Sequence, residues 1–287
     1  MSVIFSEKYK NEKFTLIELL MVIAIIGILS SFMFPSFSTA RSTAKFARWQ
    51  VYKNNLRADP ALVLYYDFED IDGNKINNQS VNLEGFNSFD SQRMNGVLKG
   101  KKHLPEWTNK GRWLGKGALT FSRKSKIVIP DSEFFEGMDN LSVEAWVKPY
   151  TKGGAHGIIT KWTAVTGGPF LLRLWHHNKV TFFVQTGEGK IRKGYSFATS
   201  SVRIPQNKWS YLVGTYDGEE IKIYINGKLS GTKEWNKGTA LRGITDMVIG
   251  EDRNNKHSFR GKIDEVAVYR RALTAEEIKM HYDIGHP

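Results

Sequence analysis

One carboxylate, Glu18, interrupts an otherwise apolar run over residues 14–34, FTLIELLMVIAIIGILSSFMF. A charged side chain inside a membrane-length helix costs about 2 to 4 kcal/mol, so it is rarely present without a partner. The run of about 21 residues would extend about 31 Å as a helix, which matches the core of a bilayer. The sequence therefore predicts a membrane-crossing helix and a cation that pairs with Glu18.

Catalytic constellations are the other patterns that could carry chemistry, and the sequence offers none. Glycoside hydrolysis needs two carboxylates about 5–10 Å apart, whereas Val143-Glu144-Ala145 supplies one Glu, expected at the surface. His176-His177 falls in a predicted hairpin turn, which favours exposure to solvent. Nucleophile-elbow, phosphate-loop and zinc spacings are absent from the sequence. We therefore predict a binding or structural protein and not an enzyme.

A short polar leader, MSVIFSEKYKNEK, precedes Phe14-Thr-Leu-Ile-Glu18. Leader, motif and apolar helix together resemble the N-terminus of type IV pilins and of type II secretion pseudopilins. The resemblance implies cleavage by prepilin peptidase between Lys13 and Phe14, methylation of the new Phe14 amine, and pairing of Glu18 with the amine of a neighbouring pilin-like subunit. The family usually has Gly before the cut, and this chain has Lys13 instead.

The same resemblance implies a location and an organisation of the chain. It places the protein in the bacterial inner membrane with a single pass and its head outside the cytoplasm, and then in a cell-surface filament or a secretion pseudopilus. Three segments are expected: a leader over 1–13, a helix over 14–58 and a globular domain over 61–287.

The second half of the predicted helix has an amphipathic pattern. Apolar residues recur at spacings of three and four, which predicts one buried helical face; they are Phe37, Ala40, Ala44, Ala47 and Val51. Asp59-Pro60 should end the helix, because a residue that precedes proline avoids helical geometry.

Strand patterns follow from residue 61 onward. They predict a mainly β fold, an antiparallel sandwich. The expected strands are 62–68, 118–121, 126–129, 141–147, 170–175, 180–185, 209–216, 220–225, 247–249 and 262–269. Thr274-Ala-Glu-Glu277 is a capping box and predicts a short C-terminal helix over 275–282.

Composition narrows the range of partners. The chain has no Cys, so its domain must be stabilised by its core, and aromatic residues make up 13% of it, as in β-rich carbohydrate binders. The formal net charge is +12. Basic clusters are expected either on the solvated surface or against an anionic polysaccharide or other polyanion; they lie at Lys99–Lys102, Arg112–Lys116, Arg123–Lys126 and Lys190–Lys193.

A second resemblance covers residues 62–284. The phrases Trp209–Gly218, Tyr224–Lys228, Gly261–Val266 and Arg271–Leu273 occur in the order found in laminin G-like domains. This resemblance implies an antiparallel concanavalin A-like jelly-roll sandwich. That family consists mostly of binding scaffolds, often for glycans, and often holds one calcium where the first and last strands meet. The resemblance thus implies a possible Ca²⁺ cofactor, with Asp67, Glu69 and Asp264 as its ligands.

Three functions remain open at this stage. The first is a pilin-like subunit that displays a glycan-binding head; the second is a secretion pseudopilin that acts through protein contacts; the third is an envelope-anchored glycan hydrolase. A polysaccharide ligand is expected, with anionic polymers favoured by the basic clusters and nucleic acid disfavoured. Sugar rings stack on flat aromatic faces, and the candidates are Trp107, Trp113, Trp162, Trp175 and Trp235.

Overall fold

A computed structural model describes residues 15–69, 71–80, 88–113, 115–163, 167–187, 194–235, 237–241, 243–252 and 257–287; for 32–38 and 88–90 it describes only the backbone. The long helix α1 spans Leu16–Arg57, within the predicted range 14–58. The chain forms two units, Met1–Ala44 and Lys45–Pro287. The predicted leader and the cleavage between Lys13 and Phe14 lie outside the described residues.

The first turn of α1 gives Glu18 a local partner. Its carboxylate accepts hydrogen bonds from the Thr15 backbone N–H at 2.8 Å and the Thr15 hydroxyl at 2.7 Å. The Glu18 N–H donates to Thr15 Oγ1 at 3.3 Å, which completes a capping box. The backbone and hydroxyl bonds from Thr15 lower the pKa of the exposed Glu18 carboxyl. The spacing Thr-x-x-Glu could have indicated this cap from the sequence alone.

The predicted inner-membrane anchor is wrong, because none of the helices described between residues 15 and 287 combines the length and the apolar character needed to cross a bilayer.

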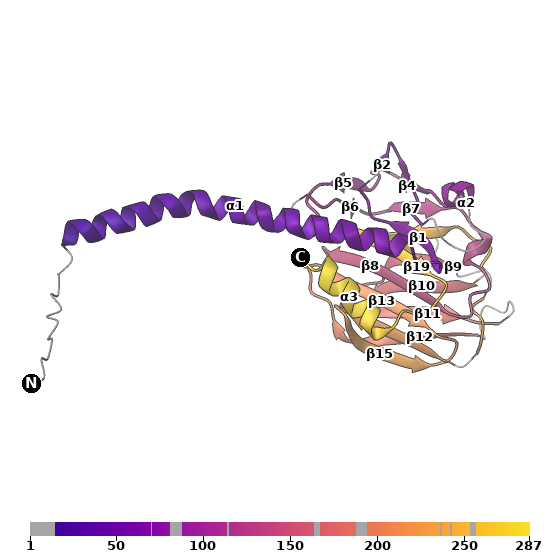
Figure 1. Ribbon diagram of the computed structural model, residues 1–287. Helices are drawn as coiled ribbons and strands as arrows, with labels where there is room; N and C mark the ends of the chain where they lie inside the picture. Colours follow the sequence, from indigo (N-terminus) through magenta and orange to yellow (C-terminus); the bar gives the residue numbers. More distant parts are fainter. Residues whose placement is uncertain are drawn as a thin grey trace, which may run out of the picture. The chain divides into compact units, whose positions relative to one another are not determined.

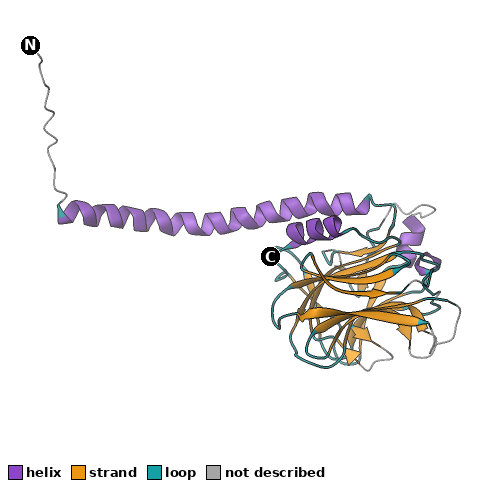
Figure 2. Ribbon diagram, turned by 90° about the horizontal axis from the view of Figure 1, so that it is seen from below, coloured by secondary structure: helices purple, strands orange, loops and turns teal. Residues whose placement is uncertain are grey.

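Two antiparallel sheets pack face to face in the Lys45–Pro287 unit, as Figure 2 shows from below. The first sheet has the order β15-β14-β13-β8-β19-β6-β5, with β1 also paired to β19. Its strands are β1 Leu62–Tyr66, β5 Glu106–Thr108, β6 Ala118–Phe121, β8 Leu141–Pro149, β13 Ser210–Tyr216, β14 Glu220–Ile225, β15 Lys228–Glu234 and β19 Gly261–Tyr269.

The second sheet has the order β12-β11-β10-β9-β16-β7-β4-β3-β2. Its strands are β2 Ile71–Asp72, β3 Lys75–Ile76, β4 Gly96–Gly100, β7 Ser125–Ile129, β9 His156–Thr163, β10 Gly167–Trp175, β11 Lys179–Gln185, β12 Tyr195–Arg203 and β16 Met247–Ile249. The remaining elements are α2 Ser88–Arg93, the 3₁₀ turn Glu133–Phe135, the hairpin of β17 Glu251–Asp252 and β18 His257–Ser258, and α3 Ala275–Gly285.

The β part of the predicted fold is confirmed: this is a mainly β antiparallel sandwich with a short C-terminal helix. Every predicted strand coincides with an observed one to within a few residues, and Thr274 and Glu277 form the predicted capping box of α3. Several strands, among them β9, β12 and β15, were not predicted, because polar residues break their alternation.

The core lies between the two sheets. Alternate residues of β8, from Leu141 to Val147, point into it and are fully buried. The sheets approach closely at Gly214 of β13, where a Cβ would lie only 2.3 Å from Cγ of Phe182 on the opposing sheet. Glycine is therefore required for this contact.

The end of α1 and α3 lie over the outer face of the first sheet (Figure 1), and a second apolar cluster fills this interface. Trp49, Tyr52 and Leu56 from the last turns of α1 are buried there, together with Ile278 of α3. The predicted helical face was wrong at this end, because Val51 is 63% exposed. The spacings of three and four from Trp49 define the buried face instead, and its aromatic side chains remove more apolar area from water than Ala47 and Val51 would.

Candidate functional site

A bulge in β19 directs two consecutive acidic residues to the same cluster. Asp264 lies opposite Trp146 of β8, and Ala267 lies opposite Glu144, so β19 has one extra residue between these pairs. Glu265 takes a left-handed φ of 43°, which is rare for a residue with a side chain. Bulges re-aim side chains in this way, and the carboxylates of Asp264 and Glu265 consequently both contact Arg112.

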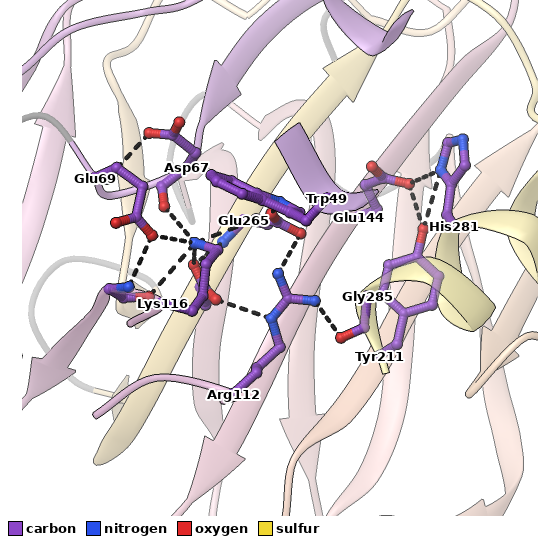
Figure 3. Close-up of polar contacts among 12 residues, drawn as sticks. Trp49, Asp67, Glu69, Arg112, Lys116, Glu144, Tyr211, Glu265, His281 and Gly285 are labelled. Atoms are coloured by element: carbon purple, nitrogen blue, oxygen red, sulfur yellow. Dashed lines mark hydrogen bonds and ion pairs between the residues drawn. The ribbon is translucent and has the colours of Figure 1, made fainter. Parts of the chain in front are cut away.

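The ammonium group of Lys116 occupies the centre of this acidic cluster (Figure 3). Its Nζ lies 2.9 Å from Asp264 Oδ1, 2.8 Å from Glu69 Oε1 and 2.8 Å from the backbone carbonyl oxygen of Asp67. The side chain is fully buried, and Nζ also lies 4.6 Å from the ring centroid of Trp49. Burial alone lowers the pKa of Lys116, but the carboxylates of Asp264 and Glu265 outweigh that effect and raise it. The ammonium is therefore charged.

Two further cations complete the group, which we call the Lys116 cluster: Lys53, Asp67, Glu69, Arg112, Lys116, Asp264 and Glu265. Arg112 donates to Asp264 at 2.9 Å and contacts Glu265 at 2.6 Å, and Lys53 of α1 lies 2.5 Å from Asp67. Three cations thus face four carboxyl groups. The cluster ties the last turns of α1 to the first and last strands of the sheet.

The carboxyl group in excess is Glu265, which Trp49 Nε1 contacts as a hydrogen-bond donor. Burial raises the pKa of Glu265 to about 7, although Arg112 and Lys116 act in the opposite direction. A neutral Glu265 would leave three carboxylates for three cations.

The implied calcium site is not supported by these contacts. The structure does bring Asp67, Glu69 and Asp264 together, as the resemblance implied. Calcium, however, needs six to eight oxygen ligands at 2.3–2.6 Å, and Lys116 Nζ already lies among these oxygens at 2.8–2.9 Å. A calcium ion beside this buried ammonium would face a like charge. Within the described ranges, no group of His, Cys, Asp and Glu side chains is arranged to hold a metal.

Glu144 is buried, contrary to the prediction that it faces solvent, because α1 and α3 cover the face of β8 from which it points. Its Oε2 accepts hydrogen bonds from Tyr211 Oη at 2.5 Å and His281 Nδ1 at 2.9 Å (Figure 3), and Oε1 accepts one from Tyr269 Oη at 3.1 Å. Glu144 therefore fastens α3 to the sheet and does not face a cleft for substrate.

The five candidate Trp residues are dispersed. Trp113 and Trp162 are 8% and 5% exposed, so neither offers a face to a sugar, and these two candidates were wrong. Trp175 and Trp235 are half-buried; the Arg173 guanidinium lies over the Trp175 ring, and Trp235 packs against the core. Trp107 is 49% exposed and donates through Nε1 to Phe68 O at 2.7 Å. Of the five, only Trp107 is exposed.

Two hollows open at one end of the sandwich, where the connections of both sheets meet. The first basic hollow, about 310 Å³, includes the cationic or ionisable residues Arg123, Lys124, Lys152, His156, His257 and Arg260. The second basic hollow, about 640 Å³, is lined by Lys152, Arg203, His177, Asn178, Gln206 and Asn207 together with Ile204 and Pro205. Lys152 lines both hollows, so they adjoin.

Hydrogen bonds hold the wall of the first basic hollow in place. Lys124 N donates to Ser258 Oγ at 3.1 Å, and Tyr150 N donates to Arg260 O at 2.9 Å. His156 Nδ1 lies 3.0 Å from Ser258 O and Nε2 lies 2.5 Å from Gly153 O. These contacts hold the His156 ring in the wall of the hollow.

The second basic hollow contains a buried acceptor. Asn178 is 2% exposed, and its Oδ1 accepts no hydrogen bond from the residues that the structure describes. His177 and Asn178 both have positive φ, 58° and 63°. Strained backbone of this kind clusters at ligand-binding sites, and a buried unpaired acceptor costs about 1–3 kcal/mol unless a ligand supplies the donor.

The sequence identified only part of this surface. Arg123–Lys126 was singled out as a basic cluster, and two of its residues line the first basic hollow. Lys152, Arg203 and Arg260 were missed, because each stands far from the others in the chain. Arg112 and Lys116 do not lie on the surface as expected but are buried in the Lys116 cluster. Lys190–Lys193 lies outside the described residues.

Comparisons with solved structures show the same fold at low identity. The binding domain of Paraclostridial Mosquitocidal Protein 1 aligns with a TM-score of 0.56 and 18% identity, covering 77% of this chain and 52% of that one. Domain 4 of AbnA, a GH43 extracellular arabinanase from Geobacillus stearothermophilus in complex with arabinotriose, gives 0.55 and 20%, covering 78% and 98%. The binding domain of botulinum neurotoxin DC in complex with SialylT gives 0.55 and 14%, covering 79% and 52%.

Two curated human proteins match shorter segments. Pappalysin-1 is 32% identical over 75 residues, and Adhesion G-protein coupled receptor D1 is 30% identical over 82 residues, which are 25% and 27% of this chain. The chain spans only 4% and 9% of their lengths. The family model described as the concanavalin A-like lectin/glucanases superfamily matches residues 121–279, more than half of the chain. The chain therefore belongs to the concanavalin A-like lectin/glucanases superfamily.

Proposed function

We propose that the sandwich unit binds carbohydrate, with the two basic hollows as its binding surface. The observation that carries the proposal is the polar, pre-organised pair of hollows at the end of the sandwich where connections from both sheets converge. The family membership supports it, as do the carbohydrates named with two similar structures, arabinotriose and SialylT.

We propose binding and not hydrolysis. A glycosidase needs two carboxylates that face its substrate. None of the described residues that line either hollow is Asp or Glu. Glu144, the strand glutamate considered from the sequence, is engaged with Tyr211, His281 and Tyr269 beneath the helices.

A glycan array probed with the full chain tests this function. We expect binding to a subset of polysaccharides, reduced by Asn178→Gly, because glycine tolerates the left-handed backbone at this position but lacks the Oδ1 acceptor. The bound polymer should show no new reducing ends after prolonged incubation. Release of reducing ends would establish an enzyme, and an array without any bound glycan would overturn the proposed function.

A second proposal concerns α1 before Lys45, for which the resemblance implies a pilin-like or pseudopilin-like subunit. Apart from Glu18, its side chains between Leu16 and Leu29 are apolar and exposed; Leu16 is 79% exposed and Ile17 66%. A helix that is apolar all round is normally buried. We propose that further copies of the chain cover this segment, as in a filament. A secretion pseudopilin would instead be expected to recruit other proteins there.

Paired substitutions of Glu18 separate two roles of its carboxylate. Gln retains the side-chain acceptor of the capping box but has no charge, whereas Ala loses both. If Glu18 pairs with the N-terminal amine of a neighbour, both Glu18→Gln and Glu18→Ala should abolish assembly measured by sedimentation, while the circular dichroism of the head is unchanged. Normal assembly of Glu18→Gln would show that Glu18 serves only as a helix cap.

A further inference from the structure

We propose that the ligand is a linear polyanionic saccharide whose acidic groups occupy both basic hollows at once. This inference rests on the proposed carbohydrate-binding function and adds the chemical class of the ligand. The first reason is charge: Arg123, Lys124, Lys152 and Arg260 line the first hollow. No described lining residue of either hollow supplies an opposing carboxylate.

Because the two hollows are continuous, they favour a polymeric ligand over a single small anion. Lys152 lines both of them, and Arg203 adds a cation to the second hollow. A single carboxylate or sulfate group could contact only part of this set. A polymer with an acidic group on successive sugars could contact Arg260, Lys152 and Arg203 together. Each contact would hold the next acidic group near its cation, which raises the effective concentration of that group and strengthens binding.

The second hollow favours a polyanionic saccharide over a nucleic acid. Asn178 Oδ1 is a buried acceptor that lacks a donor among the described residues, and sugar hydroxyl groups are donors. Single-stranded nucleic acid binds by base stacking on aromatic rings as well as by charge. The described lining of the two hollows contains no Phe, Tyr or Trp, so this second contribution is missing.

The decisive experiment compares polygalacturonate with its fully methyl-esterified form, which has the same sugars without the charge, by calorimetry on the full chain. Dextran sulfate and dextran form the corresponding sulfate pair. We expect the acidic member of at least one pair to bind at least about tenfold more tightly than its neutral partner at low salt. This advantage should decline as salt rises, because screening acts over about 8 Å at physiological ionic strength.

Oligogalacturonides of different lengths test the ligand length that the site requires, and matched variants test where the ligand binds. An octasaccharide should bind at least about tenfold more tightly than a disaccharide, and Lys152→Gln should remove most of that difference because Lys152 belongs to both hollows. Arg260→Gln and Arg203→Gln should each weaken binding of the octasaccharide. Lys233→Gln, on the exposed strand β15 at the opposite end of the sandwich, is the charge-matched control and should have no effect.

The possible failures are distinguishable. Equal binding of the acidic and neutral members in both pairs would overturn this inference and leave carbohydrate binding intact. Binding of single-stranded DNA with the affinity and salt dependence of polygalacturonate would overturn the saccharide class. Octasaccharide binding that Lys152→Gln, Arg203→Gln and Arg260→Gln all leave unchanged would place the ligand elsewhere on the molecule, and absence of any glycan binding would overturn the proposed function itself.

Discussion

Replacement of Lys116 by Met is expected to lower the free energy of unfolding by about 3–5 kcal/mol, the usual effect of removing one partner from a buried ion pair. Met is similar in length but leaves Asp264 and Glu69 without their shared ammonium. For a domain of this size the loss corresponds to a fall in Tm of about 10 °C. Thermal and urea unfolding of the full chain measure it.

Two matched variants identify charge as the cause. The double variant Lys116→Met with Asp264→Asn should lose less free energy of unfolding than the two single variants together. The reason is that the second substitution removes a carboxylate that the first left unpaired. Lys279→Met breaks an exposed pair with Asp283 within α3 and should cost at most about 1 kcal/mol. Equal losses for Lys116→Met and Lys279→Met would contradict the central role of the Lys116 ammonium.

The response of the melting temperature to calcium also tests the role of Lys116 in the Lys116 cluster. The melting temperature of the unsubstituted chain should not respond to chelator or to added calcium, because the chain's own ammonium already neutralises these carboxylates. Lys116→Ala removes the ammonium and opens space among the oxygens of Asp67, Glu69 and Asp264, so calcium should raise its melting temperature. A chelator that lowers the melting temperature of the unsubstituted chain would restore the calcium site implied by the family resemblance.

The contribution of Glu265 to the free energy of unfolding should fall as pH rises from about 4.5 to about 7. Its pKa is raised to about 7 in the folded protein, against an ordinary value of 4.5. In this interval the folded chain keeps a proton that the unfolded chain has released, so unfolding is favoured by rising pH. The complete shift corresponds to a contribution of roughly 3 kcal/mol at most.

Glu265→Gln isolates this contribution from that of other titrating groups. Gln is isosteric with the protonated carboxyl and keeps an acceptor for Trp49 Nε1. The variant should match the unsubstituted chain in urea unfolding near pH 4.5 and exceed it in stability near pH 8. Glu106→Gln, an exposed substitution on β5, is the control and should leave the pH profile unchanged. Parallel profiles for Glu265→Gln and the unsubstituted chain would show that Glu265 is ionised throughout.

The sequence by itself determined the antiparallel sandwich and the C-terminal helix. Strand periodicity in 141–147 predicted correctly which residues of β8 face the core, because alternation depends only on local backbone geometry. The capping box at Thr274 and Glu277 located the start of α3 for the same reason: its hydrogen bonds lie within one turn. The Thr15–Glu18 box carries an equally local signal, because its hydrogen bonds also lie within one turn.

Only the tertiary structure decided what faces the other side of β8 and what surrounds the acidic residues. Glu144 is buried because two helices cover it, and alternation cannot reveal whether a second layer exists. Asp67, Glu69 and Asp264 were expected around a metal, but Lys116 supplies the cation from a connection far from the last strand in sequence. The basic hollows likewise combine Lys152, Arg203 and Arg260 from separate connections, and their proximity follows from strand order rather than from any sequence spacing.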